Sequence, residues 1–83
     1  MLIDYREKIS DIDKEICNLL EKRFYICKKI GDYKKENNID ILDSKRELEV
    51  RNKISTYIKN EEYEDLIIDI FQDIMDKSKL LQK

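Results

Sequence analysis

The feature that most constrains this chain is a long amphipathic run near the N-terminus, in a sequence that has no proline. Apolar side chains recur along it every three or four residues, the spacing of one face of an α-helix. They are Ile9, Ile12, Ile16, Leu19, Ile26 and Ile30. A lone glycine, Gly31, costs about 1 kcal/mol inside a helix without ending it. We therefore predict one helix over residues 4–36, a rod of roughly 50 Å.

Two shorter helices are predicted after a linker at residues 38–42. Ser44 and Glu47 form an S-x-x-E capping box at the start of the second helix. Its apolar positions are Val50, Ile54 and Ile58. The third helix should run from about residue 60 to residue 82. Its apolar face carries Leu66 or Ile67, then Ile70, Phe71, Ile74 and Met75. The predicted fold class is all-α, with three helices of which the first is very long.

The length of the first helix also predicts an oligomer. A compact chain of 83 residues has a radius of gyration of about 12 Å and a diameter of about 30 Å. A longer rod must protrude, and its apolar face then needs a partner. We predict an intertwined homodimer that buries the long helices against each other. Residues 1–83 are expected to form a single domain, because no repeat, interdomain linker or low-complexity tract interrupts them.

Composition and charge exclude several classes of function. The net charge is −2, from 17 basic and 19 acidic residues, which argues against general nucleic-acid binding. The absence of histidine and the presence of only two cysteines argue against the usual zinc and Cys/His nucleophile sites. No apolar stretch approaches 18 residues and charges appear by Asp4, so we expect neither a signal peptide nor a membrane association. We expect a cytoplasmic protein.

Two cations of the first helix interrupt its apolar pattern. The apolar face requires a member at position 23, where the residue is Arg23, and a guanidinium on a packing face must find an anion. Lys34 follows eleven residues later on nearly the same face, about 16 Å along the helix axis. Together these side chains could converge on an anion of small-molecule size.

The second and third helices also place polar residues on their apolar faces. Asp43, Arg46 and Glu47 occupy positions i, i+3 and i+4 of one face. Ser78 and Gln82 make the last two turns of the third helix's apolar face polar. This pattern predicts a polar pocket with apolar walls at one end of the bundle.

Each of these residues also has a simpler interpretation. Arg23 could lie at the edge of the apolar face or pair with a glutamate, and Lys34 could belong to a solvated charged surface. Asp43 and Glu47 could merely cap a helix, and the last polar positions of the third helix could be a fraying terminus. Their joint occurrence on inward faces favours the pocket.

With these residues identified, the chain resembles chorismate mutases of the all-α class over essentially its whole length. The motifs that carry the resemblance are Arg6-Glu7-Lys8-Ile9, Glu21-Lys22-Arg23, Ile30-Gly31-Asp32-Tyr33-Lys34, Asp43-Ser44-Lys45-Arg46-Glu47, and Phe71-Gln72 followed by Ser78 and Gln82. Members of this class are intertwined three-helix dimers. The linker is shorter and residues 61–64 are more acidic than the family pattern suggests, but neither departure touches the expected site.

The resemblance implies the Claisen rearrangement of chorismate to prephenate in phenylalanine and tyrosine biosynthesis, with no nucleophile, metal or cofactor. It implies that Arg23 and Arg46 bind substrate carboxylates, because a guanidinium donates two parallel hydrogen bonds to a carboxylate. Arg6 lies about 25 Å along the helix from Arg23 and about 100° around it, so it should serve the site of the partner subunit.

The remaining site residues are also assigned by the resemblance. Lys34 and Gln82 should donate to the ether oxygen, where negative charge grows as the bond breaks. Glu47, with Asp43, should accept from or orient the substrate hydroxyl, and Ser78 should hydrogen-bond to a carboxylate. Lys34, Gln82 and Arg23 are then the catalytic residues of the set.

Two alternatives remain open. One is an isochorismate-pyruvate lyase of the same fold, whose pocket holds similar cations; Asp43 and Glu47, placed for a hydroxyl, favour the mutase. The other is a non-catalytic dimeric helical interaction module whose charged residues specify helix register. It explains the long helix, but it does not explain polar residues at the ends of all three helices.

Overall fold

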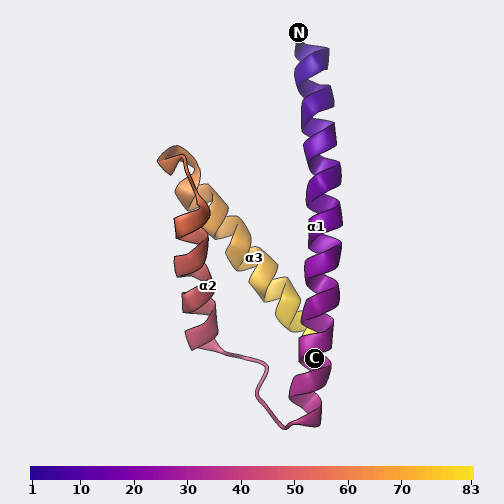
Figure 1. Ribbon diagram of the computed structural model, residues 1–83, viewed down its shortest axis with the longest axis vertical. Coiled ribbons are helices and arrows are strands. Elements are labelled where there is room, and N and C mark those ends of the chain that lie inside the picture. The colour runs from indigo at the N-terminus through magenta and orange to yellow at the C-terminus, as the bar shows by residue number, and fades with distance from the viewer.

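Three α-helices and one short 3₁₀ helix make up the protein, in a computed structural model that describes all residues 1–83 (Figure 1). In chain order they are α1 (Leu2–Glu36), α2 (Ser44–Tyr57), the 3₁₀ helix η1 (Glu61–Tyr63) and α3 (Glu64–Gln82). The predictions of an all-α fold and of a very long first helix are confirmed, since α1 alone has 35 residues.

The end of α1 is set by two asparagines. The carbonyl of Tyr33 accepts two hydrogen bonds from Asn37, one from Nδ2 at 2.8 Å and one from the backbone N–H at 3.1 Å, so Asn37 closes the last turn of the helix. Asn38 has a φ of 54°, in the left-handed region that asparagine tolerates better than most residues. The chain therefore leaves the helix here and enters the linker toward α2.

The start of α2 differs from the prediction. The N-cap is Asp43, whose Oδ1 accepts a hydrogen bond from the backbone N–H of Arg46 at 2.9 Å. Ser44 is the first residue of the helix, so the predicted capping box of Ser44 and Glu47 is wrong. A carboxylate at this position satisfies a free amide and interacts favourably with the positive end of the helix dipole.

A 3₁₀ turn precedes α3, whose first residue is Glu64 and not a residue near position 60. Asn60 caps this turn, because its Oδ1 accepts from the backbone N–H of Glu62 at 3.0 Å. The hydroxyl of Ser55 donates to Oε1 of Glu64 at 2.5 Å, which joins the end of α2 to the start of α3. These contacts set the angle at which α3 returns toward α1.

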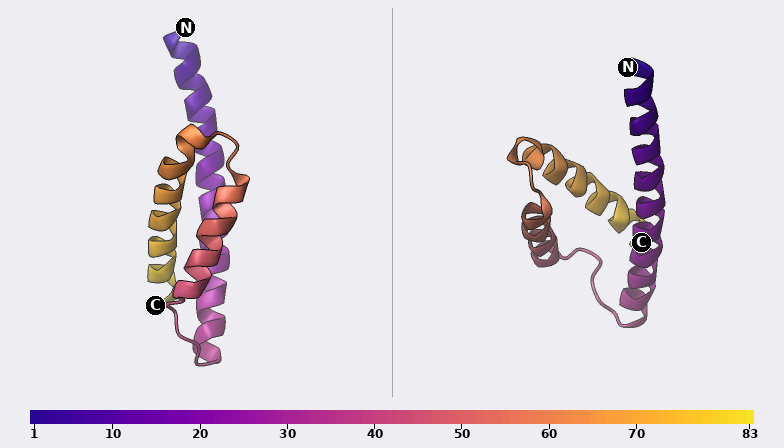
Figure 2. Two further views of the ribbon diagram at one scale, coloured as in Figure 1. Left: turned by 90° about the vertical axis from the view of Figure 1, so that its left-hand side faces the viewer. Right: turned by 45° about the horizontal axis from the view of Figure 1, so that its top comes forward.

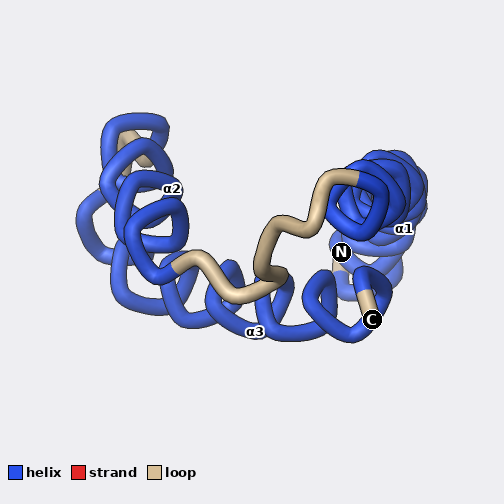
Figure 3. The backbone as a smooth tube through the Cα atoms, turned by 90° about the horizontal axis from the view of Figure 1, so that it is seen from below, coloured by secondary structure: helices blue, strands red, loops and turns tan.

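The packing places α3 between the other two helices. It contacts both α1 and α2, whereas α1 and α2 do not pack against each other. Viewed along α1, the two helices lie at opposite ends of α3, and the linker crosses the space between them (Figure 3). The buried apolar residues are few: Cys27 on α1, Ile54 on α2 and Met75 on α3.

The N-terminal end of α1 extends beyond the rest of the chain (Figure 2). The molecule measures 54 × 24 × 15 Å, and its radius of gyration is 15.6 Å, well above the value of about 12 Å for a compact chain of this length. The apolar face of α1 is uncovered over its N-terminal half: Ile9 is 57% exposed and Leu19 is 62% exposed. None of the helices combines the length and the apolarity that a membrane crossing requires.

Candidate active site

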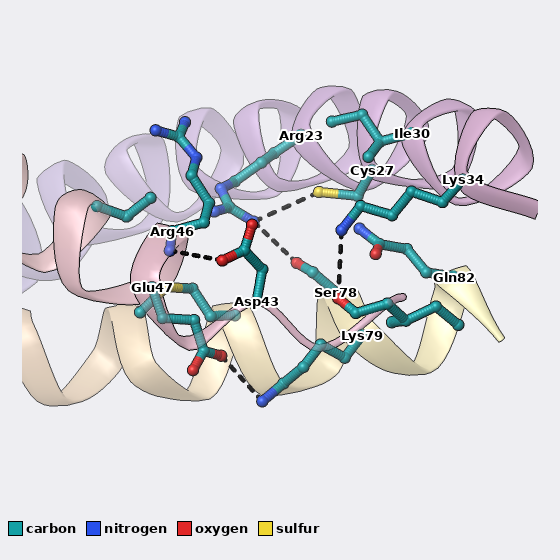
Figure 4. Close-up of a pocket in the computed structure, with 13 residues that line it drawn as sticks. Arg23, Cys27, Ile30, Lys34, Asp43, Arg46, Glu47, Ser78, Lys79 and Gln82 are labelled. Carbon is teal, nitrogen blue, oxygen red and sulfur yellow. Dashed lines mark hydrogen bonds and ion pairs between the residues drawn. The ribbon is translucent and has the colours of Figure 1, made fainter. Parts of the chain in front are cut away.

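A cavity of about 310 Å³ lies between the three helices and the linker (Figure 4). Its polar lining includes seven of the eight residues predicted from the sequence. They are Arg23, Lys34, Asp43, Arg46, Glu47, Ser78 and Gln82. The eighth, Arg6, does not line the cavity. The structure therefore brings together side chains from all three helices, as the pattern of inward-facing polar residues predicted.

Arg23 is oriented by a serine of α3. Its Nη1 donates to Oγ of Ser78 at 2.8 Å and contacts Sγ of Cys27 at 3.6 Å. The Ser78 hydroxyl in turn donates to the carbonyl of Ile74 at 2.7 Å, so its lone pairs face the guanidinium. A guanidinium has five N–H donors, and this contact leaves most of them available to an anion in the cavity.

Lys34 connects the end of α1 to the linker. Its ammonium donates to the carbonyl of Ile41 at 3.2 Å, and this contact makes the linker one wall of the cavity. An ammonium has three donors, so two N–H groups remain for a ligand. The position of Lys34 in the last turn of α1 also complements the negative end of the helix dipole.

Gln82 is the last residue of α3 and one of the few buried polar side chains. It is 8% exposed, and its Oε1 is buried without a hydrogen-bond partner. A buried polar atom left unpaired costs about 1–3 kcal/mol, so Oε1 of Gln82 requires a partner from outside the chain, such as a water molecule or a ligand. The carboxamide of Gln82 is thus placed in the cavity wall without being satisfied by the chain itself.

Asp43 and Arg46 lie at the mouth of the cavity. Oδ1 of Asp43 is occupied as the N-cap of α2, which leaves Oδ2 for a ligand. The Arg46 guanidinium pairs with Glu49 at 3.5 Å, and both side chains are more than half exposed. An ion pair this exposed contributes little to stability, so Arg46 can exchange it for an anionic ligand at small cost.

One charged residue of the cavity, Lys79, was not predicted from the sequence. Its ammonium lies 2.9 Å from Oε1 of Glu47 on α2 and 3.3 Å from Oδ1 of Asp76 on α3. The contact with Glu47, followed by that with Asp76, raises the pKa of Lys79 above its ordinary value. Hydrogen bonds from Gln72 and then Lys79 lower the pKa of Asp76. The signal available in the sequence was its spacing, because Lys79 lies four residues after Met75 and three before Gln82 on one face of the helix.

The cavity as a whole suits an anionic organic ligand. Four cationic side chains and two carboxylates line it, so its formal charge is +2. The remaining walls are largely apolar. They are formed by Cys27, Ile30, Ile41, Val50 and Met75. A small dianion with an apolar body matches both the charge and the walls.

Residues 5–83 of this chain match the sequence pattern of the family described as chorismate mutase type II. The chain belongs to this family. A chorismate mutase of Methanocaldococcus jannaschii is 32% identical over 83 residues, which are 99% of this chain and 84% of that protein. The activity that follows for the chain is that of a chorismate mutase, an intramolecular transferase of aromatic amino acid biosynthesis.

Two longer relatives of the same family carry a second activity. Bifunctional chorismate mutase/prephenate dehydratases of two subspecies of Buchnera aphidicola, Schizaphis graminum and Acyrthosiphon pisum, are each 36% identical over 99% of this chain. The match covers 22% of each of those proteins. No solved structure is significantly similar to the chain.

Proposed function

We propose that a homodimer of this chain converts chorismate to prephenate in the cavity between its three helices. In this Claisen rearrangement one C–O bond breaks as one C–C bond forms. The protein must hold a flexible dicarboxylate in its reactive shape and stabilise negative charge on the ether oxygen. The observation that carries the proposal is the cavity itself, where four cations and two carboxylates meet on apolar walls.

Arginines bind the two substrate carboxylates in this proposal. Arg23, held by Ser78 at 2.8 Å, is prepositioned for one of them, which lowers the entropy lost on binding. Arg46 at the mouth and Arg6 of the partner subunit supply the remaining guanidinium donors. Ser78 donates its hydroxyl to a substrate carboxylate when the hydroxyl turns from the carbonyl of Ile74 toward the cavity.

Lys34 and Gln82 stabilise the ether oxygen as the C–O bond breaks. Both line the cavity, and Lys34 uses only one of its three N–H donors within the chain, on the carbonyl of Ile41; Gln82 donates through Nε2 of its carboxamide. Prepositioned donors of this kind typically contribute about 3–4 kcal/mol each to lowering a barrier. No proton needs to leave either residue, because the rearrangement transfers none.

Glu47, with Asp43, orients the substrate hydroxyl. A carboxylate accepts hydrogen bonds only, and one oxygen of Glu47 is engaged by Lys79 at 2.9 Å. The other oxygen is then the acceptor for the hydroxyl. This arrangement favours a substrate whose hydroxyl lies on the side of α2.

The exposed apolar face of α1 supports the homodimer. Along the N-terminal half of α1, Ile9, Ile12 and Leu19 are 57%, 53% and 62% exposed, an arrangement that a single chain in water does not tolerate well. Pairing of two α1 helices covers this face and brings Arg6 of each chain near the other chain's cavity. The site is complete only in that assembly.

The test is to incubate the purified protein with chorismate and, separately, with isochorismate, and to identify the products. We expect prephenate from chorismate with wild type and almost none with Arg23→Ala. Arg51→Ala is the matched control, because Arg51 is the one arginine outside the proposed site, and it should keep wild-type turnover. Pyruvate from isochorismate as the main product would indicate the lyase, and no turnover by a folded dimer would refute the proposal.

A further inference from the structure

We propose that Lys79 is a positioning residue, which holds the Glu47 carboxylate in the orientation that receives the substrate hydroxyl. The proposal rests on the function proposed above. Lys79 on α3 and Glu47 on α2 both line the cavity, and they meet at 2.9 Å (Figure 4). No residue of α1 takes part in this contact.

The Glu47 carboxylate depends on Lys79 for its position. Its Oε1 is buried, and no donor meets it with the alignment of a regular hydrogen bond, so the contact with Lys79 is an ion pair more than a directional bond. The Lys79 and Glu47 side chains are 29% and 24% exposed, which shields the pair from much of the solvent screening that weakens surface pairs. Without Lys79 this buried oxygen would have no partner.

Lys79 is itself held from the α3 side. Its ammonium lies 3.3 Å from Oδ1 of Asp76, and the same oxygen accepts from Nε2 of Gln72 at 3.0 Å. Residues 72, 76 and 79 follow one face of the helix at spacings of four and three. These contacts hold the Lys79 ammonium between the carboxylates of Asp76 and Glu47, so that it points toward Glu47 before substrate binds.

The charge of Lys79 matters as much as its geometry. A carboxylate in a cavity that binds a dicarboxylate repels its own substrate unless a cation compensates it. Loss of the ammonium lowers the formal charge of the cavity from the value of +2 given by its lining and leaves Glu47 uncompensated. Lys79 thus allows the site to contain an acceptor for a hydroxyl and still attract an anion.

The test compares Lys79→Met with Lys77→Met, which removes the same charge from an exposed neighbour on the same helix that does not line the cavity. We expect Lys79→Met to raise KM for chorismate about tenfold with kcat changed less than about threefold, because ground state and transition state lose the same contact. Lys79→Arg should avoid most of the increase in KM that Lys79→Met causes. Lys77→Met should match wild type.

A double-mutant cycle separates positioning from a general effect on folding. In a Glu47→Gln background, Lys79→Met should change KM by less than about twofold, because the carboxylate that it serves is gone. For variants with slow turnover, prephenate binding measured by calorimetry provides the same comparison. If Lys79→Met does not fold, Lys79→Gln takes its place. Equal losses in both backgrounds, or a wild-type KM in Lys79→Met, overturn the positioning role; absence of turnover in wild type refutes the proposed function instead.

Discussion

Gly31 of α1 lies directly against Gln82 of α3, so closely that no side chain fits between them. A Cβ on Gly31 would lie 2.7 Å from Cα and 2.9 Å from Cβ of Gln82. Such separations are shorter than van der Waals contact, and the first of these atoms is backbone. The only glycine of the chain is therefore what allows the end of α3 to bring its carboxamide into the cavity.

Gly31→Ala should therefore impair catalysis by displacing Gln82. Alanine favours the helix by about 1 kcal/mol over glycine, but the clash must move the backbone of α3. A misplacement of about 1 Å in a catalytic group can lower the rate by about 10²-fold. We expect kcat to fall by about that factor while α1 remains helical by circular dichroism.

The route through Gln82 can be checked by combining variants. Because both changes act on the same carboxamide, Gly31→Ala should add little to the loss already caused by Gln82→Ala. Fully additive losses would indicate that Gly31 acts elsewhere in the structure. A folded Gly31→Ala protein with unchanged kcat would show that Gln82 is not needed at its present position.

Lys34→Ala should abolish most turnover if Lys34 is the donor to the ether oxygen that we propose. By comparison with other prepositioned donors, we expect a loss of about 10²–10³ in kcat. Lys35→Ala is the matched control, since it removes the same charge from the next residue, which is exposed and does not line the cavity. Comparable activity of the two variants in single-turnover measurements would exclude Lys34 from the catalytic role.

The local features of this chain were predictable from its sequence. The apolar spacing of α1 depends on a repeat within one helix, and the same spacing places Arg23 and Lys34 on one face. The cap of α2 was missed by one residue, because Asp43 and Ser44 are both good N-caps and only the backbone angles decide between them. Helix boundaries of this kind depend on details that a pattern does not contain.

The pairing of Lys79 with Glu47 could not be predicted in this way. The two residues belong to different helices, and their contact depends on how α2 and α3 are rotated about their own axes. The spacing of Asp76 and Lys79 on α3 predicts only a local pair at i and i+3. The close approach of Gly31 to Gln82 likewise depends on the crossing of α1 and α3, which no periodicity within either helix specifies.

Mixing two inactive variants should restore activity if the sites are composite. In a heterodimer of Arg6→Ala and Arg23→Ala chains, the cavity of the Arg6→Ala chain keeps its own Arg23 and receives Arg6 from the other chain. When an equal mixture is refolded, half of the dimers are heterodimers, and one of the two sites in each heterodimer is complete. The mixture should therefore recover about a quarter of wild-type activity. Mixtures that stay as inactive as the separate variants would show that Arg6 does not serve the partner's site.

The pH dependence of the rate should reflect an amide at position 82. An amide donates hydrogen bonds at every pH, so the wild-type kcat should be nearly flat from about pH 5 to pH 8. Gln82→Glu introduces a carboxyl that donates only when protonated. The kcat of Gln82→Glu should therefore rise as pH falls. A wild-type kcat that falls steeply across the range from about pH 5 to pH 8 would contradict the role of Gln82.

The pair of Asp76 and Lys79 predicts a pH dependence of stability that is separate from catalysis. Hydrogen bonds from Gln72 and then Lys79 lower the pKa of Asp76 below its ordinary value of 3.8. A lowered pKa stabilises the folded state above the unfolded-state value and ceases to do so as pH falls through the folded-state pKa. We therefore expect the thermal midpoint of Asp76→Asn to lie below that of wild type at pH 7.

The difference between Asp76→Asn and wild type should shrink as the carboxylate is protonated at acidic pH. Lys79 shows the opposite dependence on pH, because its pKa is raised above the ordinary value of 10.5. Its contribution to the stability of the folded state is full below the unfolded-state pKa and is lost as pH rises through the folded-state pKa. Between about pH 5 and pH 9 both groups keep their charges, so the difference between the thermal midpoints of Asp76→Asn and wild type should stay constant. A difference that persists unchanged under strongly acidic conditions would mean that the Asp76 carboxylate does not stabilise α3 through its charge.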